Sequence, residues 1–258
     1  MSELKHIQFQ IEDRVARITF ARPPLNVFNI AMMREVSAAI DQCAHRDVVA
    51  IVFDAAAGTR AFSAGVAVEE HLPETVFQML DSFHNIFRLL TQISKPAIAV
   101  VDGPALGGGC ELVAGCDIVI ASDRARFGQP EIKLGVFPPV AAILLARIVG
   151  EKKAREMILL GEMIDANEAL RLGLVNYVVP SSELEHKTNG VLAKLRENSS
   201  SSLSMTHAAL ELGAAGGDLD SALEKLENFY LNELMKTEDA QEGVRAFMEK
   251  RKPVWRNR

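Results

Sequence analysis

The chain has 258 residues, which is enough for one large domain or two small ones. Hydrophobic residues make up 48% and charged residues 24%, as in an ordinary globular protein, and the net charge of −6 argues against nucleic-acid binding. No apolar run reaches the roughly 18 residues of a membrane-spanning helix. The start of the chain lacks a charged-then-apolar signal pattern, and the three cysteines show no ligand-like pairing. These features predict a cytoplasmic protein.

The first half of the chain alternates strand and helix patterns. Period-two alternation predicts a hairpin at its start, continuous apolar runs predict buried strands, and apolar stripes of helical period predict helices between them. The expected strands are residues 7–11, 15–20, 48–53, 97–101 and 118–121. The expected helices are residues 29–42, 75–91 and one that begins at about residue 108.

Beyond about residue 139 the strand patterns nearly disappear. One short strand is expected at residues 176–179, and the serine run 199–202 favours a loop. The expected helices are residues 141–149, 152–160, 166–172, 183–197, 203–212, 219–235 and 239–250. This order predicts an α/β core followed by a helical C-terminal part, with no repeat of fixed period in the sequence.

Four segments carry residues suited to chemistry. They are residues 22–27 (RPPLNV), 61–66 (AFSAGV), 101–111 (VDGPALGGGCE) and 127–138 (FGQPEIKLGVFP). The glycine run of the third segment offers bare backbone N–H groups at a helix start, followed by the carboxyl group of Glu111. The fourth segment adds Glu131 directly after a proline. Backbone donors beside two carboxyl groups are suited to polarising a carbonyl and moving protons next to it.

In this order and spacing, the four segments resemble the enoyl-CoA hydratase/isomerase (crotonase) superfamily, from about residue 7 to the C-terminus. The resemblance implies an α/β fold with a crotonase-like spiral of ββα units in residues 1–195. It implies a helical trimerisation region in residues 196–258, and a homotrimer or a dimer of trimers. It also implies an acyl-CoA thioester as substrate, so that coenzyme A is part of the substrate and no metal or separate cofactor is needed.

The resemblance implies roles for four residues. The N–H groups of Ala64 and Gly108 would form an oxyanion hole for the thioester oxygen, and Glu111 and Glu131 would handle water and proton. Each glutamate also has a structural alternative. For Glu111 the alternative is a residue that only favours the first turn of a helix, and for Glu131 it is an ordinary solvated loop residue.

Further residues are expected along the bound acyl-CoA. They are Asn26, Ser63, Ala64, Gly65, Val66, Val68, Gly107, Phe137, Pro139 and Lys250. For Lys250 a solvated helix end is the alternative. The six histidines show no metal-ligand spacing, and His71 is expected either in the pocket or at a solvated helix end.

Two positions depart from the common hydratase pattern. Ala67 stands where many relatives carry aspartate, in a loop that helps to hold the adenine of coenzyme A. Pro139 stands where typical hydratases carry a glycine whose N–H can bond the attacking water, and proline has no N–H to donate. Pro139 is also well suited to the first turn of a helix, and both interpretations are compatible.

The pairing of residues 62–66 (FSAGV) with residues 135–142 (GVFPPVAA) most resembles the branch of cyclohexa-1,5-diene-1-carbonyl-CoA hydratases of anaerobic aromatic degradation. That resemblance implies 1,4-addition of water to give 6-hydroxycyclohex-1-ene-1-carbonyl-CoA. Our hypothesis is that a ring substrate suits an apolar pocket narrowed by Phe137 and Pro139. Hydration of a linear enoyl-CoA and isomerisation of a double bond are the alternatives within enzymes. A non-catalytic, RNA-binding relative of the same fold is the alternative outside them.

Overall fold

The computed structural model describes residues 4–214 and 218–258, and it is built around a six-stranded sheet. The strand order is β1-β2-β3-β4-β6-β9, in which only β1 and β2 pair antiparallel. These strands are β1 (Ile7–Glu12), β2 (Val15–Phe20), β3 (Ala50–Ala55), β4 (Ala97–Val101), β6 (Ile118–Ser122) and β9 (Tyr177–Val179). A second sheet of three short strands contains β5 (Pro104–Leu106), β7 (Arg126–Gly128) and β8 (Met163–Asp165).

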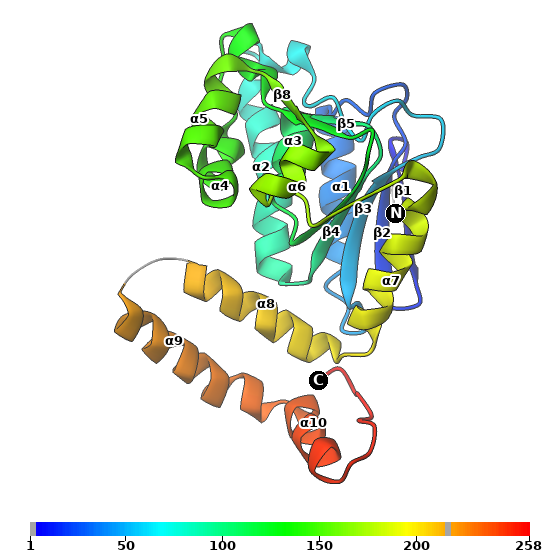
Figure 1. Ribbon diagram of the computed structural model, residues 1–258, viewed down its shortest axis with the longest axis vertical. Coiled ribbons are helices and arrows are strands. Elements are labelled where there is room, and N and C mark those ends of the chain that lie inside the picture. The colour runs from blue at the N-terminus through cyan, green and yellow to red at the C-terminus, as the bar shows by residue number, and fades with distance from the viewer. Residues whose placement is uncertain (1–3, 215–217) are drawn as a thin grey trace.

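Helices cover the main sheet, and three more form an arm beside it (Figure 1). The body contains α1 (Ile30–Gln42), α2 (Val76–Ile93), α3 (Gly108–Ala114), α4 (Pro139–Val149), α5 (Glu151–Leu160), α6 (Ala166–Leu172) and α7 (Leu184–Arg196). The arm contains α8 (Ser200–Ala214), α9 (Leu219–Asn232) and α10 (Glu238–Met248). Single 3₁₀ turns are η1 (Val68–His71), η2 (Pro130–Leu134), η3 (Ser181–Glu183) and η4 (Leu234–Lys236).

Strand β3 explains why the sheet is covered on both faces. Its side chains alternate between the faces, so Ile51 and Phe53 join the large apolar core that includes buried residues of α1, α2 and α3. Val52 points to the opposite face, where it shares a smaller apolar cluster with Leu184 and Leu192 of α7. A strand buried on both faces needs a continuous apolar run, which is the pattern found in the sequence.

The structure confirms the α/β architecture and the helical second half, and it corrects several details. The three strands of the small sheet were not predicted, and β3 begins two residues later than expected. The serine run is helical rather than a loop, because α8 begins at Ser200. The helix expected at residues 219–235 ends at Asn232, and η4 follows it. The domain division after residue 195 stays a prediction.

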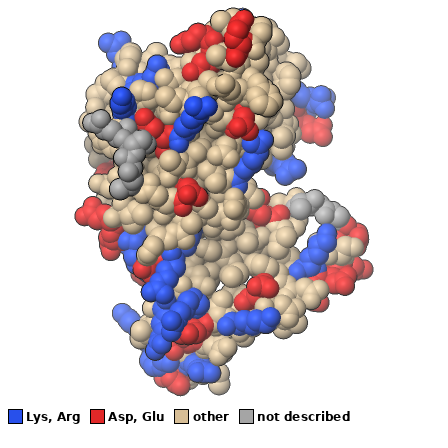
Figure 2. Space-filling view, turned by 180° about the vertical axis from the view of Figure 1, so that it is seen from behind, with Lys and Arg blue, Asp and Glu red and all other residues tan. Residues whose placement is uncertain are grey.

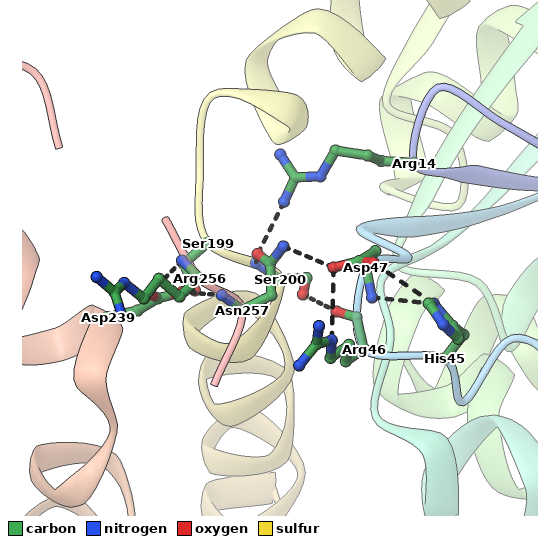
Figure 3. Close-up of polar contacts among 9 residues, drawn as sticks. All are labelled: Arg14, His45, Arg46, Asp47, Ser199, Ser200, Asp239, Arg256 and Asn257. Carbon is green, nitrogen blue, oxygen red and sulfur yellow. Dashed lines mark hydrogen bonds and ion pairs between the residues drawn. The ribbon is translucent and has the colours of Figure 1, made fainter. Parts of the chain in front are cut away.

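The end of the chain fastens the arm to the body through a polar cluster (Figure 3). Asp239 is 1% exposed, and its carboxylate accepts the backbone N–H groups of Arg256 and Asn257 at 2.7 Å each. It also accepts the hydroxyl of Ser199 at 2.5 Å. The Asn257 amide in turn donates to Asp47 of the body at 3.0 Å. Asp239 therefore organises a segment that joins α8, α10 and the sheet domain.

We expect Asp239→Ala to lower the free energy of unfolding by about 2–4 kcal/mol, because three donors lose their buried acceptor at once. Thermal melts and urea titrations measure this change. The control is Glu238→Ala, whose carboxylate is about half exposed and makes only surface ion pairs with Arg256 and Arg258. A melting temperature for Asp239→Ala equal to that of the control would contradict the assigned role.

Candidate active site

A cavity of about 350 Å³ lies where the glycine turn, α2, η1, η2 and the start of α4 meet. Most of the residues expected at the site line it. They are Ala64, Gly65, Val66, Val68, Gly107, Gly108, Glu111, Glu131, Phe137 and Pro139. Three of the four chemistry-bearing segments therefore converge on one cavity, although they are separated along the chain.

Glu111 lies in the first turn of α3 and is only 3% exposed. Its Oε1 accepts the N–H of Ala141 at 2.9 Å, at the start of α4. Burial raises the pKa of this carboxyl group to about 7, the N–H groups of Ala141 and Val140 oppose the rise, and the charge of Glu131 adds to it. Glu111 is therefore held in place by a helix start and is ready to exchange a proton near neutral pH.

Glu131 enters the cavity from η2 and lies directly over the glycine turn. A Cβ atom placed on Gly107 would come within 2.5 Å of Glu131 Oε1. With its amide nitrogen turned toward the carboxylate, the buried Gln129 donates to the two oxygens of Glu131 at 3.3 and 3.2 Å. Burial raises the pKa of Glu131 to about 7 as well. Two carboxyl groups with raised pKa values thus share one cavity.

The backbone N–H groups of Val66 and Gly108, both on the cavity wall, have no acceptor among residues 4–214 and 218–258. Gly108 is the first residue of α3, so its N–H has no partner within the helix. Val66 pairs with Phe28 in a single parallel bridge, in which Gly65 O accepts from Phe28 N and Ala67 N donates to Phe28 O. Because successive peptide groups of an extended segment point in opposite directions, the Val66 N–H points away from Phe28.

These two donors belong to neighbouring loops. Gly65 has φ +98°, and a Cβ atom built on it would lie 3.5 Å from the backbone nitrogen of Gly108. A Cβ atom on Gly108 would meet Val66 Cγ2 at 2.9 Å. The glycines therefore allow the two backbones to approach closely enough to present their N–H groups side by side.

The expectation that Ala64 supplies one of the donors is wrong. The Ala64 N–H donates to Leu25 O at 2.9 Å and is not available to a ligand, although the residue borders the cavity. The free donor of this loop is the N–H of Val66, two residues further along. Only the long-range pairing with Leu25 and Phe28 decides which peptide group of the loop is free.

Three other expected contact residues do not line the cavity. Asn26 is fully buried, and its side chain bonds Ala61 O at 3.0 Å. Ser63 is also fully buried and donates to Asn26 O at 2.8 Å, so both residues hold the loop rather than a ligand. Lys250 is exposed at the end of α10, on the arm.

One wall of the cavity comes from α2 and was not assigned to the site in advance. Its members are Val76, Met79, Leu80, Phe83 and His84. The signal in the sequence is the helical spacing of the apolar stripe in the expected helix of residues 75–91. This stripe forms both cavity wall and core, since Met79 and Phe83 are also buried core residues. His71 lines the cavity too, which decides between its two alternatives.

The described ranges, 4–214 and 218–258, contain no group of three or more His, Cys, Asp or Glu side chains that could hold a metal ion. Across the same ranges, no helix has the length and apolarity to cross a membrane.

The comparisons with known proteins agree with this geometry. The enoyl-CoA hydratase/isomerase family matches residues 10–258. The chain is 37% identical over 257 residues to the short-chain-enoyl-CoA hydratase of Clostridium acetobutylicum, covering 97% of each chain. It is 34% identical over 248 residues to the cyclohexa-1,5-dienecarbonyl-CoA hydratase of Thauera aromatica, covering 94% of this chain and 93% of that one.

Solved structures lead to the same family. The crystal structure of the enoyl-CoA hydratase of Mycobacterium smegmatis superimposes with a TM-score of 0.90 at 30% identity, covering 98% of this chain and 99% of that one. The chain therefore belongs to the enoyl-CoA hydratase/isomerase (crotonase) family, and the expected fold is confirmed. The expectation of an enzyme of the hydro-lyase type is confirmed at the level of the family, because relatives matched over nearly their whole length are hydratases.

Proposed function

We propose that this protein adds water to a conjugated enoyl- or dienoyl-CoA thioester. The observation that carries the proposal is the pairing, in one cavity, of two glutamates of raised pKa with two unpartnered backbone N–H groups. The glutamates are Glu111 and Glu131, and the donors are Val66 and Gly108. These parts fit a reaction in which negative charge develops on a carbonyl oxygen while protons move nearby.

In the proposed mechanism, the thioester oxygen binds between the N–H groups of Val66 and Gly108. Water held by Glu111 and Glu131 loses a proton to one carboxylate as its oxygen attacks the β-carbon. The resulting enolate charge is stabilised by the two N–H groups, and the other carboxyl group supplies the proton that completes the addition. Because burial raises both pKa values to about 7, the two carboxyl groups exchange protons readily at neutral pH.

For the acyl group, we propose cyclohexa-1,5-diene-1-carbonyl-CoA as the leading substrate. Charge would then spread through a dienolate, and the proton would return at the vinylogous carbon to give 6-hydroxycyclohex-1-ene-1-carbonyl-CoA. The Thauera aromatica relative supports this choice. The apolar wall of Leu80, Phe83, Phe137 and Pro139 also supports it, since a flat hydrocarbon ring needs no polar partner there.

Pro139 takes the first position of α4, where it offers no N–H to the attacking water. The next two N–H groups of the helix, from Val140 and Ala141, both stabilise the charge of Glu111. We propose that water is held by the carboxylates alone, and that the proline stiffens the wall against which the ring lies. This would favour a rigid ring over a short flexible chain.

A side-by-side hydration assay tests the proposal. Crotonyl-CoA and cyclohexa-1,5-diene-1-carbonyl-CoA are supplied separately, and the products are resolved by mass. We expect the ring substrate to be converted faster than crotonyl-CoA. Pro139→Gly should lower the ratio of kcat/KM for the ring substrate to kcat/KM for crotonyl-CoA by about tenfold, which is the scale of one lost apolar contact.

The opposite results have definite meanings. Faster conversion of crotonyl-CoA, with an unchanged ratio in Pro139→Gly, would identify a linear enoyl-CoA hydratase, in keeping with the Clostridium acetobutylicum relative. Movement of a double bond without addition of water would identify an isomerase. Gly190→Ala in α7 serves as the control variant, because a Cβ atom there meets nothing within 4 Å and the residue lies outside the cavity.

We also propose an oligomeric state and a cellular location, and we propose that the protein does not bind RNA. The apolar side chains of α9, such as Leu219 at 73% and Leu231 at 64% exposure, support a trimer or a dimer of trimers built through the arm. Three unpaired cysteines support a cytoplasmic location. Against the RNA-binding alternative, Figure 2 shows basic side chains interspersed with acidic ones on the face it presents.

A further inference from the structure

The segment from Val66 to His71 supplies three parts of the cavity. It provides the unpartnered N–H of Val66 and two side chains of the wall, Val68 and His71. A segment with these tasks must be fixed in space, because a donor displaced by about 1 Å loses much of its value to a transition state.

The start of the segment is tied to the body through the backbone. Gly65 O accepts the Phe28 N–H at 2.8 Å, and the Ala67 N–H donates to Phe28 O at 2.9 Å. These two bonds lie on either side of Val66 and set the direction of its N–H. They do not reach η1, the turn that follows.

The end of the segment is held by one side chain. Both carboxylate oxygens of Glu70 accept the N–H of Ile30 at 2.9 Å. Ile30 is the first residue of α1, so its N–H has no partner within the helix, while the side chain of Asn29 caps the N–H of Met32. The negative charge of Glu70 also suits the positive end of a 13-residue helix.

Glu70 shows no other task within the described ranges. It does not line the cavity, and no cation lies within 4 Å of its carboxylate there. The other hydrogen bonds of η1 are local, and they include those of His71 and of the Glu70 N–H with Ala67 O and that of Thr75 with Glu70 O. The contact with Ile30 is therefore the one hydrogen bond by which η1, in the described structure, is fixed to a distant part of the chain.

We propose that Glu70 is a positioning residue of the active site, which fixes the oxyanion-binding loop to the start of α1. This bond acts together with the two Phe28 bonds to hold the Val66 N–H at the thioester oxygen, and it keeps Val68 and His71 on the cavity wall. The inference rests on the proposed hydratase function, because it assigns Val66 a donor role in that reaction. It adds a residue outside the cavity to the machinery of the site.

The test compares four variants of the full-length protein. Glu70→Ala removes the acceptor, whereas Glu70→Gln keeps an amide oxygen that can still accept the Ile30 N–H. Glu69→Ala is the matched control, because the side chain of Glu69, next to Glu70 in the chain, is exposed and makes no hydrogen bond within the described residues. Asn29→Ala removes a cap of α1 without touching η1, and so measures the effect of weakening that helix alone.

We expect Glu70→Ala to lower kcat about 10- to 100-fold with KM changed less than about threefold, since the interaction it disturbs acts mainly in the transition state. Glu70→Gln should recover most of the lost kcat, and Glu69→Ala should match the wild type. Asn29→Ala should lower the melting temperature yet keep kcat within about twofold. If Glu70 has a purely structural role, Glu70→Ala and Asn29→Ala should lose the same amounts of kcat and of melting temperature. That result would overturn the proposal. An unchanged kcat in Glu70→Ala would overturn it as well.

A second readout does not depend on hydration. Cinnamoyl-CoA is a conjugated thioester whose absorbance shifts to longer wavelength when donors polarise its carbonyl. At saturation, wild type and Glu70→Gln should show this shift, and Glu70→Ala should show less of it. If the wild type shifts the spectrum but hydrates no substrate, the proposed reaction fails while the role of Glu70 is still tested. If the wild type binds the ligand without any shift, the positioning role itself is overturned.

Discussion

Replacing Glu131 by glutamine is expected to lower kcat for hydration by about 10³-fold, while the protein stays folded. The amide has nearly the shape of the carboxyl group and can keep contact with Gln129, but it cannot take or give a proton. General acid–base catalysis by a positioned side chain contributes about 10²- to 10⁴-fold, so its removal has an effect of this order. Steady-state kinetics with the better of the two substrates measures it.

The pH dependence of the reaction should change as well. Burial raises the pKa values of Glu111 and Glu131 to about 7, and the proposed mechanism needs one group protonated and the other ionised. The wild type should therefore show a bell-shaped profile of kcat/KM around neutral pH. Glu131→Gln leaves one titrating group, so one limb of the bell should disappear along with most of the activity.

Stability provides the control for this variant. Burial raises the pKa of Glu131 to about 7, so the folded protein holds this proton up to that pH, whereas the unfolded chain releases it near the ordinary glutamate value of 4.5. The folded state therefore binds more protons between these values, and stability falls as the pH rises through this window. Glutamine avoids that loss, so Glu131→Gln should melt no lower than wild type at pH 8. The activity control is Glu74→Gln, which makes the same change at an exposed glutamate. A melting temperature of Glu131→Gln below that of wild type at pH 8, or a kcat close to that of Glu74→Gln, would contradict the role of Glu131 in proton transfer.

The fold shows which features a single sequence can reveal. The run that became β3 is buried on both faces, and the stripe of α2 faces core and cavity, so both are visible as apolar patterns. The strands of the small sheet are three residues each, which is too short for alternation to be seen. The serine run was misjudged because Ser199 caps α8 by accepting the Ser202 N–H, a role in which serine begins a helix.

The site divides in the same way. Glu111 and Glu131 could be found because the chemistry depends on side chains at fixed places in two motifs. The free N–H of Val66 could not be found, because it depends on the pairing of its loop with Phe28, 38 positions earlier. In the same loop Leu25 O occupies the N–H of Ala64, and the buried Ser63 donates to Asn26 O, so neighbouring residues of one motif have different tasks. Glu70 carries no motif signal at all, since its partner is a backbone group of another element.

Replacing Gly107 by alanine is expected to lower kcat by about 10²-fold or more, because the added methyl group would displace the carboxylate of Glu131. Gly107 has φ +51°, and a Cβ atom there would lie 2.5 Å from Glu131 Oε1 and 3.3 Å from the carboxyl carbon. No backbone atom lies that close, so the flexible end of the Glu131 side chain moves rather than the fold. A displaced carboxylate no longer meets the water and the reacting carbon in line, and a shift of about 1 Å is enough to cost this much.

The matched control is Gly58→Ala. Gly58 also has a positive φ, +87°, and a Cβ atom on it meets nothing within 4 Å, so this variant places a side chain at a positive φ without touching the site. Both variants should lower the melting temperature, while only Gly107→Ala should lose activity. Equal kcat values for the two would mean that Glu131 keeps its working position beside a methyl group, and the geometry proposed for proton transfer would then be wrong.

Combining Gly107→Ala with Glu131→Gln tests whether the methyl group acts only through the Glu131 carboxylate. If the methyl group acts only by displacing the carboxylate, it should have little further effect once the carboxylate is gone, so the two losses should not add.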